Sequence, residues 1–554
     1  MSKNSAFESS PIKRRAVLDD AHIGDIHGAF GSIGANDVGP RATVWAKVKT
    51  MLAILGPGLI VMVGDNDAGA FGTYSQAGQN YGTTLLWTLL LLVPVLFVNQ
   101  EMVLRLGVVT GVGHARLIFE RFGKFWGAFS VIDLFILNAL TIVTEFIGIS
   151  LGLQYLGVSK IWGIAAAALV IMAAATTGNF RRFERFAMLL ILGSLLVVPI
   201  IFIVHPPIGQ IAHDFLVPAM PANSKLSEVI LLIIAIVGTT IAPWQLFFQQ
   251  SYVIDKRITP RFMSYERADL CLGIVIVVIG AVAMIAFCAQ AFAGKPEFGN
   301  FADAGAIAIG LEKYYGHLPG TLFAIALIDA SIIGASAVSL STAYALGDVL
   351  SLKHSLHRKA GDAKGFYAVY CGLIALAAAL VLTPGAPLGL LTNLVQTLAG
   401  VLLPSATVFL LLLCNDKEVL GPWANSKLSN YFAGAIVAVL VMLSVVLTAS
   451  VLFPRITDMQ ILGILGFGIV TTVSSAVIAR MYEHSRGIKP PKAPVFDTSV
   501  RDTWRMPPIG QLKPARISLL NKLWMTVLRG YLVVAGGMLI FKMIQLVTGH
   551  AIGV

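Results

Sequence analysis

The chain has 554 residues, of which 56% are hydrophobic and only 12% are charged. A soluble domain of this length cannot bury so much apolar surface, so the composition indicates a polytopic membrane protein. The formal net charge of +11 does not call for nucleic acid as a partner. Basic loops on one side of a membrane, together with attraction to anionic lipid, account for it.

The first 48 residues contain acids and basic pairs but no apolar core like that of a signal peptide. We therefore expect a disordered cytoplasmic N-terminal tail over 1–48.

Mostly apolar runs of roughly 18 to 28 residues, which is enough to cross a bilayer, follow the tail. They predict twelve spans and a weaker thirteenth, with starts near positions 52, 82, 125, 159, 185, 226, 267, 319, 365, 388, 429, 458 and 526. The predicted organisation is a first five-span unit at 49–205, a second at 226–414, two spans at 429–482, a cytoplasmic linker at 483–523 and the weak last span at 524–548.

The basic residues between these spans predict the topology. With a cytoplasmic N-terminus, only five Lys and Arg residues fall outside, namely Lys160, Lys225, Lys295, Lys313 and Arg455. This bias obeys the positive-inside rule. We expect a multi-pass protein of the plasma membrane, as in a bacterial inner membrane.

Two spans are interrupted near their middles, in corresponding places of the two five-span units. The first interruption covers 64–70, just after Gly56-Pro57-Gly58, and the second covers 238–243. Unwound backbone at membrane depth is tolerated only where it lines a polar cavity or is buried in protein. The pair of interruptions therefore predicts the midplane binding site of a transporter with inverted repeats.

The first interruption contains Asp65 and Asp67 among small residues, where free carbonyls would lie beside carboxylates. In the second, the helix would end by exposing the carbonyls near Thr239 before a half-helix begins after Pro243. Both ends favour a cation. A pair of simple hinges would not need two acids.

Other acids lie within or beside spans, where an ionisable group usually has a function or a partner. Glu101 precedes Arg105 by four residues, so we expect an ion pair. Asp133 and Asp348 lie near span ends and are assigned structural roles. Asp329 lies in a small-residue run and is either a second cation-attracting acid or the partner of a polar group on a neighbouring span.

The four cysteines have no paired spacing, which predicts neither a metal site nor disulfides. They are Cys271, Cys288, Cys371 and Cys414.

Several motifs recur in a definite order along the chain. They are Gly56-Pro57-Gly58, Asp67-Ala68-Gly69-Ala70 and Gln76-Ala77-Gly78 in the first span, and the stretches 105–111, 144–148 and 415–421. Their order and spacing resemble those of the Nramp (natural resistance-associated macrophage protein) metal-ion transporters. The resemblance covers roughly 45–425. It implies an all-α LeuT-type fold of five spans plus five inverted spans, with the first and sixth broken around the ion and two or three extra spans at the C-terminus.

The resemblance also assigns the metal site. The family's first-span Asp corresponds to Asp67 and its Asn to Ala70, while its sixth-span Met corresponds to Ala242. We expect the Asp67 side chain to bind the ion, with Ala70, Thr239 and Ala242 contributing backbone carbonyls or lining the cavity. The secondary candidates are Asp65, Glu145, Asp329 and Gln396.

These departures from the family pattern predict the ion. A thioether is a soft ligand that favours Mn²⁺ and Fe²⁺ over Mg²⁺ and Ca²⁺, and none stands at Ala242. Mg²⁺ binds through one or two carboxylates and keeps several waters, which suits a roomier site. The combination resembles the Nramp-related magnesium transporters and predicts transport of partly hydrated Mg²⁺, with Mn²⁺ tolerated. The alternative is a proton-coupled Mn²⁺/Fe²⁺ carrier.

Proton coupling is also weakened. Ile142, Trp244 and Gln249 stand where the family keeps proton-handling groups, which leaves Glu145 and Asp67 as titratable residues. The membrane potential alone drives a divalent cation inward, with about 4.6 kcal/mol available at about 100 mV. We therefore expect uncoupled transport by alternating access.

The remaining expectations concern other functions and partners. The spans hold no constellation of catalytic residues, so we expect no enzyme and no cofactor besides the transported ion. A carboxylate at the first interruption would repel the carboxylate of an amino-acid substrate. The expected partners are divalent cations and the lipid bilayer, and the sequence leaves the oligomeric state open, with a monomer compatible.

Overall fold

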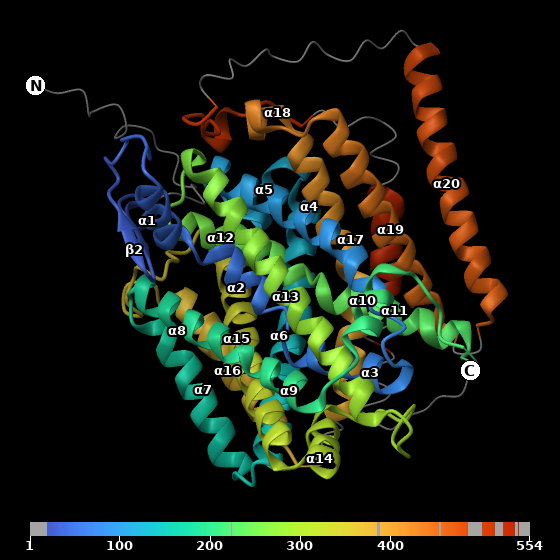
Figure 1. The fold of residues 1–554 in the computed structure, drawn as a ribbon. Coiled ribbons are helices and arrows are strands. Elements are labelled where there is room, and N and C mark those ends of the chain that lie inside the picture. The colour runs from blue at the N-terminus through green and yellow to red at the C-terminus, as the bar shows by residue number, and fades with distance from the viewer. Residues whose placement is uncertain are drawn as a thin grey trace, which may run out of the picture.

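The computed structural model describes residues 19–222, 224–384, 388–453, 456–485, 501–515, 525–537 and 541. Most of them belong to helices that pack side by side (Figure 1). The expected linker at 483–523 and the expected thirteenth span at 524–548 lie partly outside these ranges. The helix Met525–Gly537 is the described part of that last span.

Residues 19–48 are folded, so the expectation of a disordered tail is wrong for this stretch. A 3-10 turn, Asp20–His22, precedes a hairpin of β1 (Ile26–Gly28) and β2 (Gly31–Ile33), in which Ile26 pairs with Ile33. Arginines at the ends of later helices donate to the backbone carbonyls of this segment. Their bonds are Arg181 Nε to Gly28 O at 3.0 Å and Arg257 Nε to Ala21 O at 3.0 Å.

The first predicted span is built from three helices: α1 (Val44–Ile54), α2 (Pro57–Val63) and α3 (Ala68–Tyr81). The chain bends by 52° between α1 and α2. At the bend, Gly56 has a φ of 156°, and a Cβ there would lie 2.3 Å from Glu184 Oε1. Only glycine fits this close approach. Gly64–Asp67 then separate α2 from α3, which confirms the first interruption.

The rest of the first unit follows in order. Its helices are α4 (Trp87–Thr110), α5 (His114–Phe122), α6 (Lys124–Tyr155), α7 (Lys160–Thr176), α8 (Phe180–Gly193), a 3-10 turn at Ser194–Leu196, α9 (Val197–Val204) and α10 (Ile208–Leu216).

The second unit begins with the other interrupted span. Its helices are α11 (Leu226–Thr240), α12 (Pro243–Asp255), a 3-10 turn at Pro260–Phe262, α13 (Met263–Phe292), α14 (Ala304–Tyr315), α15 (His317–Leu350), α16 (Lys364–Leu382) and α17 (Leu388–Asn415). The remaining elements are α18 (Lys417–Leu420), a 3-10 turn at Gly421–Trp423, α19 (Lys427–Leu452), α20 (Asp458–Ser485) and a 3-10 turn at Ile509–Gln511.

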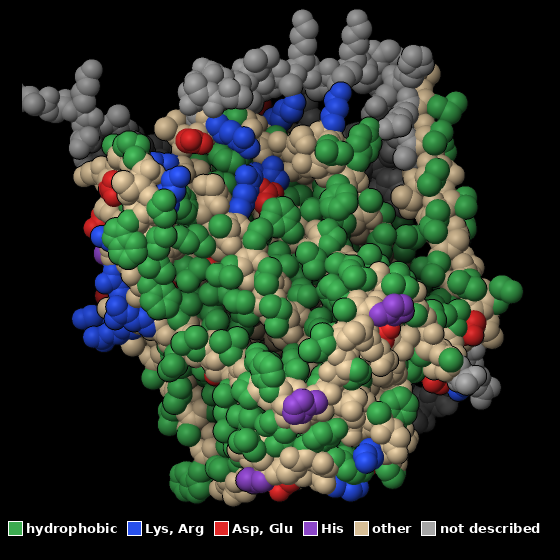
Figure 2. All heavy atoms as spheres, in the orientation of Figure 1, with side chains coloured by type: hydrophobic (Ala, Val, Ile, Leu, Met, Phe, Trp, Pro, Cys, Tyr) green, Lys and Arg blue, Asp and Glu red, His purple; other side chains and the backbone are tan. Residues whose placement is uncertain are grey.

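Ten helices in the described residues are long and apolar enough to cross a membrane, or eleven if the bent pair α1 and α2 is one span. The apolar helix α7 was expected as a further span, but it has only 17 residues. Hydrophobic side chains cover the middle of the visible face (Figure 2). Such a surface suits contact with lipid.

The two ends of the bundle are named here by what they carry. The hairpin end holds residues 26–33, and the α14 end holds α14 and the loop before it (Figure 1). The helix α13 packs closely against both α2 and α3. A Cβ on Gly58 of α2 would lie 2.6 Å from Leu270 N, and one on Gly78 of α3 would lie 2.4 Å from Ile285 O.

The expected structural acids have partners. Glu101 Oε2 lies 3.0 Å from Arg105 Nη2, which confirms the predicted ion pair. Asp133 Oδ2 accepts a hydrogen bond of 2.8 Å from the Ser405 hydroxyl. Asp348 Oδ1 lies 3.2 Å from His354 Nε2. All four cysteines are free in the structure.

Candidate ion-binding site

The first break is held open by side chains that cap it. Asp67 Oδ1 accepts a 2.9 Å hydrogen bond from Ala70 N, so the carboxylate caps the N-terminus of α3. Asn66 Nδ2 donates to Val277 O on α13 at 3.2 Å. Asp side chains are favoured at such caps because the first N–H groups of a helix have no partner within it. Short capping residues thus set where α3 begins.

The second break separates α11 from α12 at Ile241 and Ala242. Pro243 begins α12, where its missing N–H and fixed φ suit a first helical position, and Ala242 stands at the N-cap with only a methyl group. Thr240 O accepts a 3.4 Å hydrogen bond from Gln245 Nε2. The buried Thr239 hydroxyl has no hydrogen-bond partner among the described residues.

Two contacts join the breaks directly. Gln245 Nε2, on the first turn of α12, donates to Asp65 Oδ1. Tyr74 on α3 makes a 2.6 Å hydrogen bond with the Thr240 hydroxyl. The structure therefore brings together Asp65 and the carbonyl end of α11, as a midplane cation site requires.

Asp67 faces a different neighbour. Its carboxyl group lies within hydrogen-bonding reach of Glu145 on α6, and Glu145 Oε2 also accepts a 3.1 Å bond from Ala68 N. Gly334 on α15 closes over both acids, because a Cβ there would lie 2.8 Å from Glu145 Cδ and 3.0 Å from Asp67 Cβ. A hydrogen bond between two carboxyl groups requires a proton on one of them.

The other candidate residues lie in several places. Ala70 is buried on α3. Asp329 lies against α8, where a Cβ on Gly193 would be 2.3 Å from Asp329 Oδ1, so it is placed away from the two breaks. Gln396 belongs to α17, but its side chain lies outside the described residues.

Sequence reasoning missed Gln245 and Tyr74 as parts of this region. Gln245 carried a signal, because it stands two residues after Pro243, at the start of the half-helix that faces the first break. Tyr74 lies seven residues after Asp67, two turns along α3 and on the same face.

A cavity of about 630 Å³ extends from the α14 end to Ala68 and Gly69, next to the first break. It runs from the loop at 301–303 to Ala68 and Gly69 and passes polar groups on α3, α6 and α11. The polar lining residues are Thr73, Gln76, Asn80, Tyr81, Thr144, Glu228, Asp303 and Thr392. Asp65, by contrast, is fully buried.

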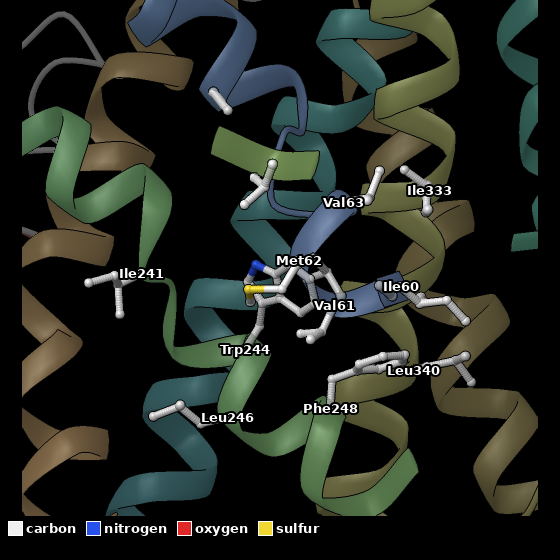
Figure 3. Packing of buried hydrophobic residues seen from close by; sticks show 14 of the residues in the cluster. Ile60, Val61, Met62, Val63, Ile241, Trp244, Leu246, Phe248, Ile333 and Leu340 are labelled. Atoms are coloured by element: carbon white, nitrogen blue, oxygen red, sulfur yellow. The ribbon is translucent and has the colours of Figure 1, made fainter. Parts of the chain in front are cut away.

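The hairpin end is closed by tight packing. Met62 on α2 lies against Trp244 on α12, with Val61, Ile60 and Phe248 close by (Figure 3). No group of three His, Cys, Asp or Glu side chains in the described residues could hold a metal ion. The donors near the breaks are instead a carboxylate, a backbone carbonyl and an amide.

Broken spans, facing acids and carbonyls, and a polar cavity from one end define a multi-pass membrane transporter of the LeuT-type fold. The chain belongs to the Nramp family, because the family model described as "Natural resistance-associated macrophage protein-like" matches residues 58–450.

Relatives and solved structures agree with this membership. The chain is 28% identical over 429 residues to the divalent metal cation transporter MntH of Ralstonia nicotianae, covering 74% of this chain and 92% of the relative. It is 26% identical over 439 residues to MntH of Yersinia enterocolitica, covering 75% and 98%. These relatives are named as transporters and not as enzymes.

The fold is similar to that of the Eremococcus coleocola manganese transporter, solved in complex with an aromatic bis-isothiourea substituted compound. The TM-score is 0.60 at 19% identity, covering 79% of this chain and 94% of that one. A mutant of the same transporter gives a TM-score of 0.61, covering 81% and 96%.

Proposed function

We propose that this protein is a divalent-cation transporter that carries Mg²⁺, tolerates Mn²⁺ and works without proton coupling. The curated relatives are named for divalent metal cations and the similar structures for manganese. Transport of divalent cations thus rests on family membership. The preference for Mg²⁺ rests on the residues of the two breaks.

The observation that carries the preference is the alanine at the N-cap of α12. Ala242 follows the last carbonyls of α11 and offers no thioether, while Ala70 on α3 offers no amide. The polar groups that meet at the two breaks are a carboxylate, two hydroxyls, an amide and a backbone carbonyl, from Asp65, Tyr74, Thr240 and Gln245. Oxygen ligands favour hard cations such as Mg²⁺.

Few direct ligands leave room for water. Mg²⁺ loses its water reluctantly and usually keeps several molecules when one or two carboxylates bind it. The cavity from the α14 end is large enough, at about 630 Å³, for an ion that arrives with its hydration shell. A partly hydrated ion at the breaks supports Mg²⁺ over a fully stripped Mn²⁺.

The proposal of uncoupled transport is supported by three residues that cannot carry a proton. Ile142, Trp244 and Gln249 are all buried and none of them titrates near neutral pH. One observation favours the alternative, a proton-coupled Mn²⁺/Fe²⁺ carrier: Asp67 and Glu145 lie side by side under Gly334. A proton shared by two such carboxyl groups would be displaced by an arriving cation.

Proteoliposomes separate the two functions. With a pH dye inside, Mg²⁺ and Mn²⁺ entry should leave the internal pH unchanged, and a K⁺/valinomycin potential, negative inside, should speed entry. Acidification that scales with metal flux, after subtraction of the leak in protein-free liposomes, would establish the coupled carrier. Glu145→Gln, which cannot release a proton, should then abolish the acidification and leave flux driven by potential.

A further inference from the structure

Asp65 has an unusual environment for a carboxylate. Its side chain is fully buried, and Oδ2 has no hydrogen-bond partner among the described residues. Its Oδ1 accepts from the amide Nε2 of Gln245. A buried carboxylate with no cation beside it is costly, so a group of this kind usually has a function.

The amide of Gln245 sits at a point where oxygen atoms converge. Its Nε2 donates to Asp65 Oδ1 and lies 3.4 Å from Thr240 O, which belongs to the other break. The two N–H groups of an amide carry partial positive charge and take neighbours like those of a cation. The amide nitrogen therefore marks a position that a cation can take.

We propose that Asp65, the Thr240 carbonyl and the Gln245 side chain form a subsite for a hydrated divalent cation, in which the ion replaces the amide N–H groups of Gln245. The proposal rests on the proposed function and adds Asp65 as a second carboxylate beside Asp67. In this subsite the Gln245 amide turns over, so that Oε1 faces the ion and Nε2 faces away.

Gln100 allows this turn. In the structure, Gln245 Oε1 accepts a 2.9 Å hydrogen bond from Gln100 Nε2, while Gln100 Oε1 has no partner among the described residues. When both amides turn over together, Gln245 Nε2 donates to the free Gln100 Oε1. The hydrogen bond between the two glutamines is kept, and the buried acceptor on Gln100 gains a donor.

The neighbouring Asp67 is engaged differently. One of its oxygens caps α3 through Ala70 N, and its carboxyl group also contacts Glu145. Among the described residues, the Asp65 side chain is bound only by Gln245. The Gln245 amide can turn over and present its oxygen in place of its N–H groups. An ion that arrives past Ala68 thus meets Asp67 first and Asp65 beyond it. Mg²⁺ usually binds through one or two carboxylates, and these two residues supply that number.

Calorimetric titration of purified protein with MgCl₂ tests the subsite. Asp65→Asn is isosteric and should weaken Mg²⁺ binding by about tenfold or more, because lost support around a metal already costs about 10–100-fold. Gln245→Leu should weaken it as well. The control is Asp133→Asn, which removes another acid, on α6 and bonded to Ser405. This variant should bind Mg²⁺ with the wild-type affinity.

Infrared difference spectra, with and without Mg²⁺, give a readout that does not depend on any substitution at Asp65. The wild type should show a shifted side-chain amide band, and Gln245→Leu should lose it. The same spectra of the wild type keep the proposal testable if Asp65→Asn fails to fold.

The two proposals fail in different ways. Unchanged Mg²⁺ affinity in folded Asp65→Asn, or no amide shift in the Mg²⁺-loaded wild type, would overturn the subsite and leave Mg²⁺ transport standing. Wild-type protein that neither binds nor transports Mg²⁺ but carries Mn²⁺ would overturn the proposed function. If that protein still loses Mn²⁺ affinity in Asp65→Asn, the subsite holds with a different ion.

Discussion

Lys256 Nζ lies 2.6 Å from Glu184 Oε1, with both side chains fully buried beneath the bend between α1 and α2. The same ammonium donates to Ile54 O at 2.6 Å and to Leu55 O at 2.9 Å. Asp269 Oδ2 meanwhile accepts from Gly58 N at 2.7 Å. One cation thus links α8, the end of α12 and the bend that closes the hairpin end.

Lys256→Met should destabilise the protein strongly. Removing one member of a buried pair leaves an uncompensated charge, which costs about 3–5 kcal/mol. Within the described part of the chain, the Glu184 side chain would keep only its bond from Ala29 N. The melting temperature in detergent, read by intrinsic fluorescence, should fall. Lys313→Met removes an exposed partner of Glu297 and should leave the melting temperature nearly unchanged. An equal fall in both variants would contradict the stabilising role of Lys256.

Asp67→Asn should abolish transport while the protein stays folded. The Asn oxygen still accepts from Ala70 N and caps α3, so the break keeps its shape, but the charge that we expect to bind the ion is gone. Mg²⁺ flux in proteoliposomes should drop to the protein-free leak, with an unchanged elution profile on size exclusion. Flux at the wild-type level in a folded variant would remove Asp67 from the site.

Ala70→Asn combined with Ala242→Met should shift selectivity. The pair restores the amide and the thioether of the family pattern, and sulfur prefers Mn²⁺ and Cd²⁺ over Mg²⁺. Calorimetry should show the ratio of Cd²⁺ to Mg²⁺ affinity rise, most strongly with the Met change present. An unchanged ratio in the double variant would mean that other residues set the selectivity.

Stability should decline at alkaline pH through His354, which lies in the loop after α15. Burial alone lowers the pKa of His354, but the hydrogen bond and ion pair with Asp348 outweigh it and raise the pKa to about 9. Since the folded pKa lies above the unfolded one, the stabilisation is complete below about pH 6.5 and is lost as pH rises through about 9.

The measurement is a series of melting temperatures from about pH 6 to about pH 10. The wild-type value should fall across the upper half of that range, and His354→Gln should flatten the curve. The ring centroids of His22 and His354 lie 5.6 Å apart. The same pH series should therefore be measured for a His22→Gln variant. His205→Gln, a change at an exposed residue, should reproduce the wild-type curve.

Local patterns in the sequence predicted local features well. Glu101 and Arg105 are one helical turn apart, so their ion pair could be predicted from spacing alone. The two breaks could also be predicted from the sequence, since small residues and Pro243 interrupt apolar runs. Asp67 and Glu145 were expected on the strength of motifs, and the structure brings them together.

Contacts between distant positions could not be predicted in this way. Lys256 and Glu184 lie 72 positions apart, and nothing in either local segment signals that their side chains meet. The choice of Gln245 as the neighbour of Asp65 depends on how α2 and α12 pack. The folded hairpin was missed for the same reason, because distant arginines on α8 and beyond α12 donate to its segment.

The hairpin has a practical consequence for anyone who shortens or labels this protein. The family match begins at residue 58, yet Ala29 N donates a 2.5 Å hydrogen bond to Glu184 Oε2, the partner of Lys256. Trimming the chain to the family boundary would strip a donor from the buried acid and uncover the arginines of α8. A fluorophore on the hairpin would, by the same contacts, lie close to the Lys256–Glu184 pair and report changes there.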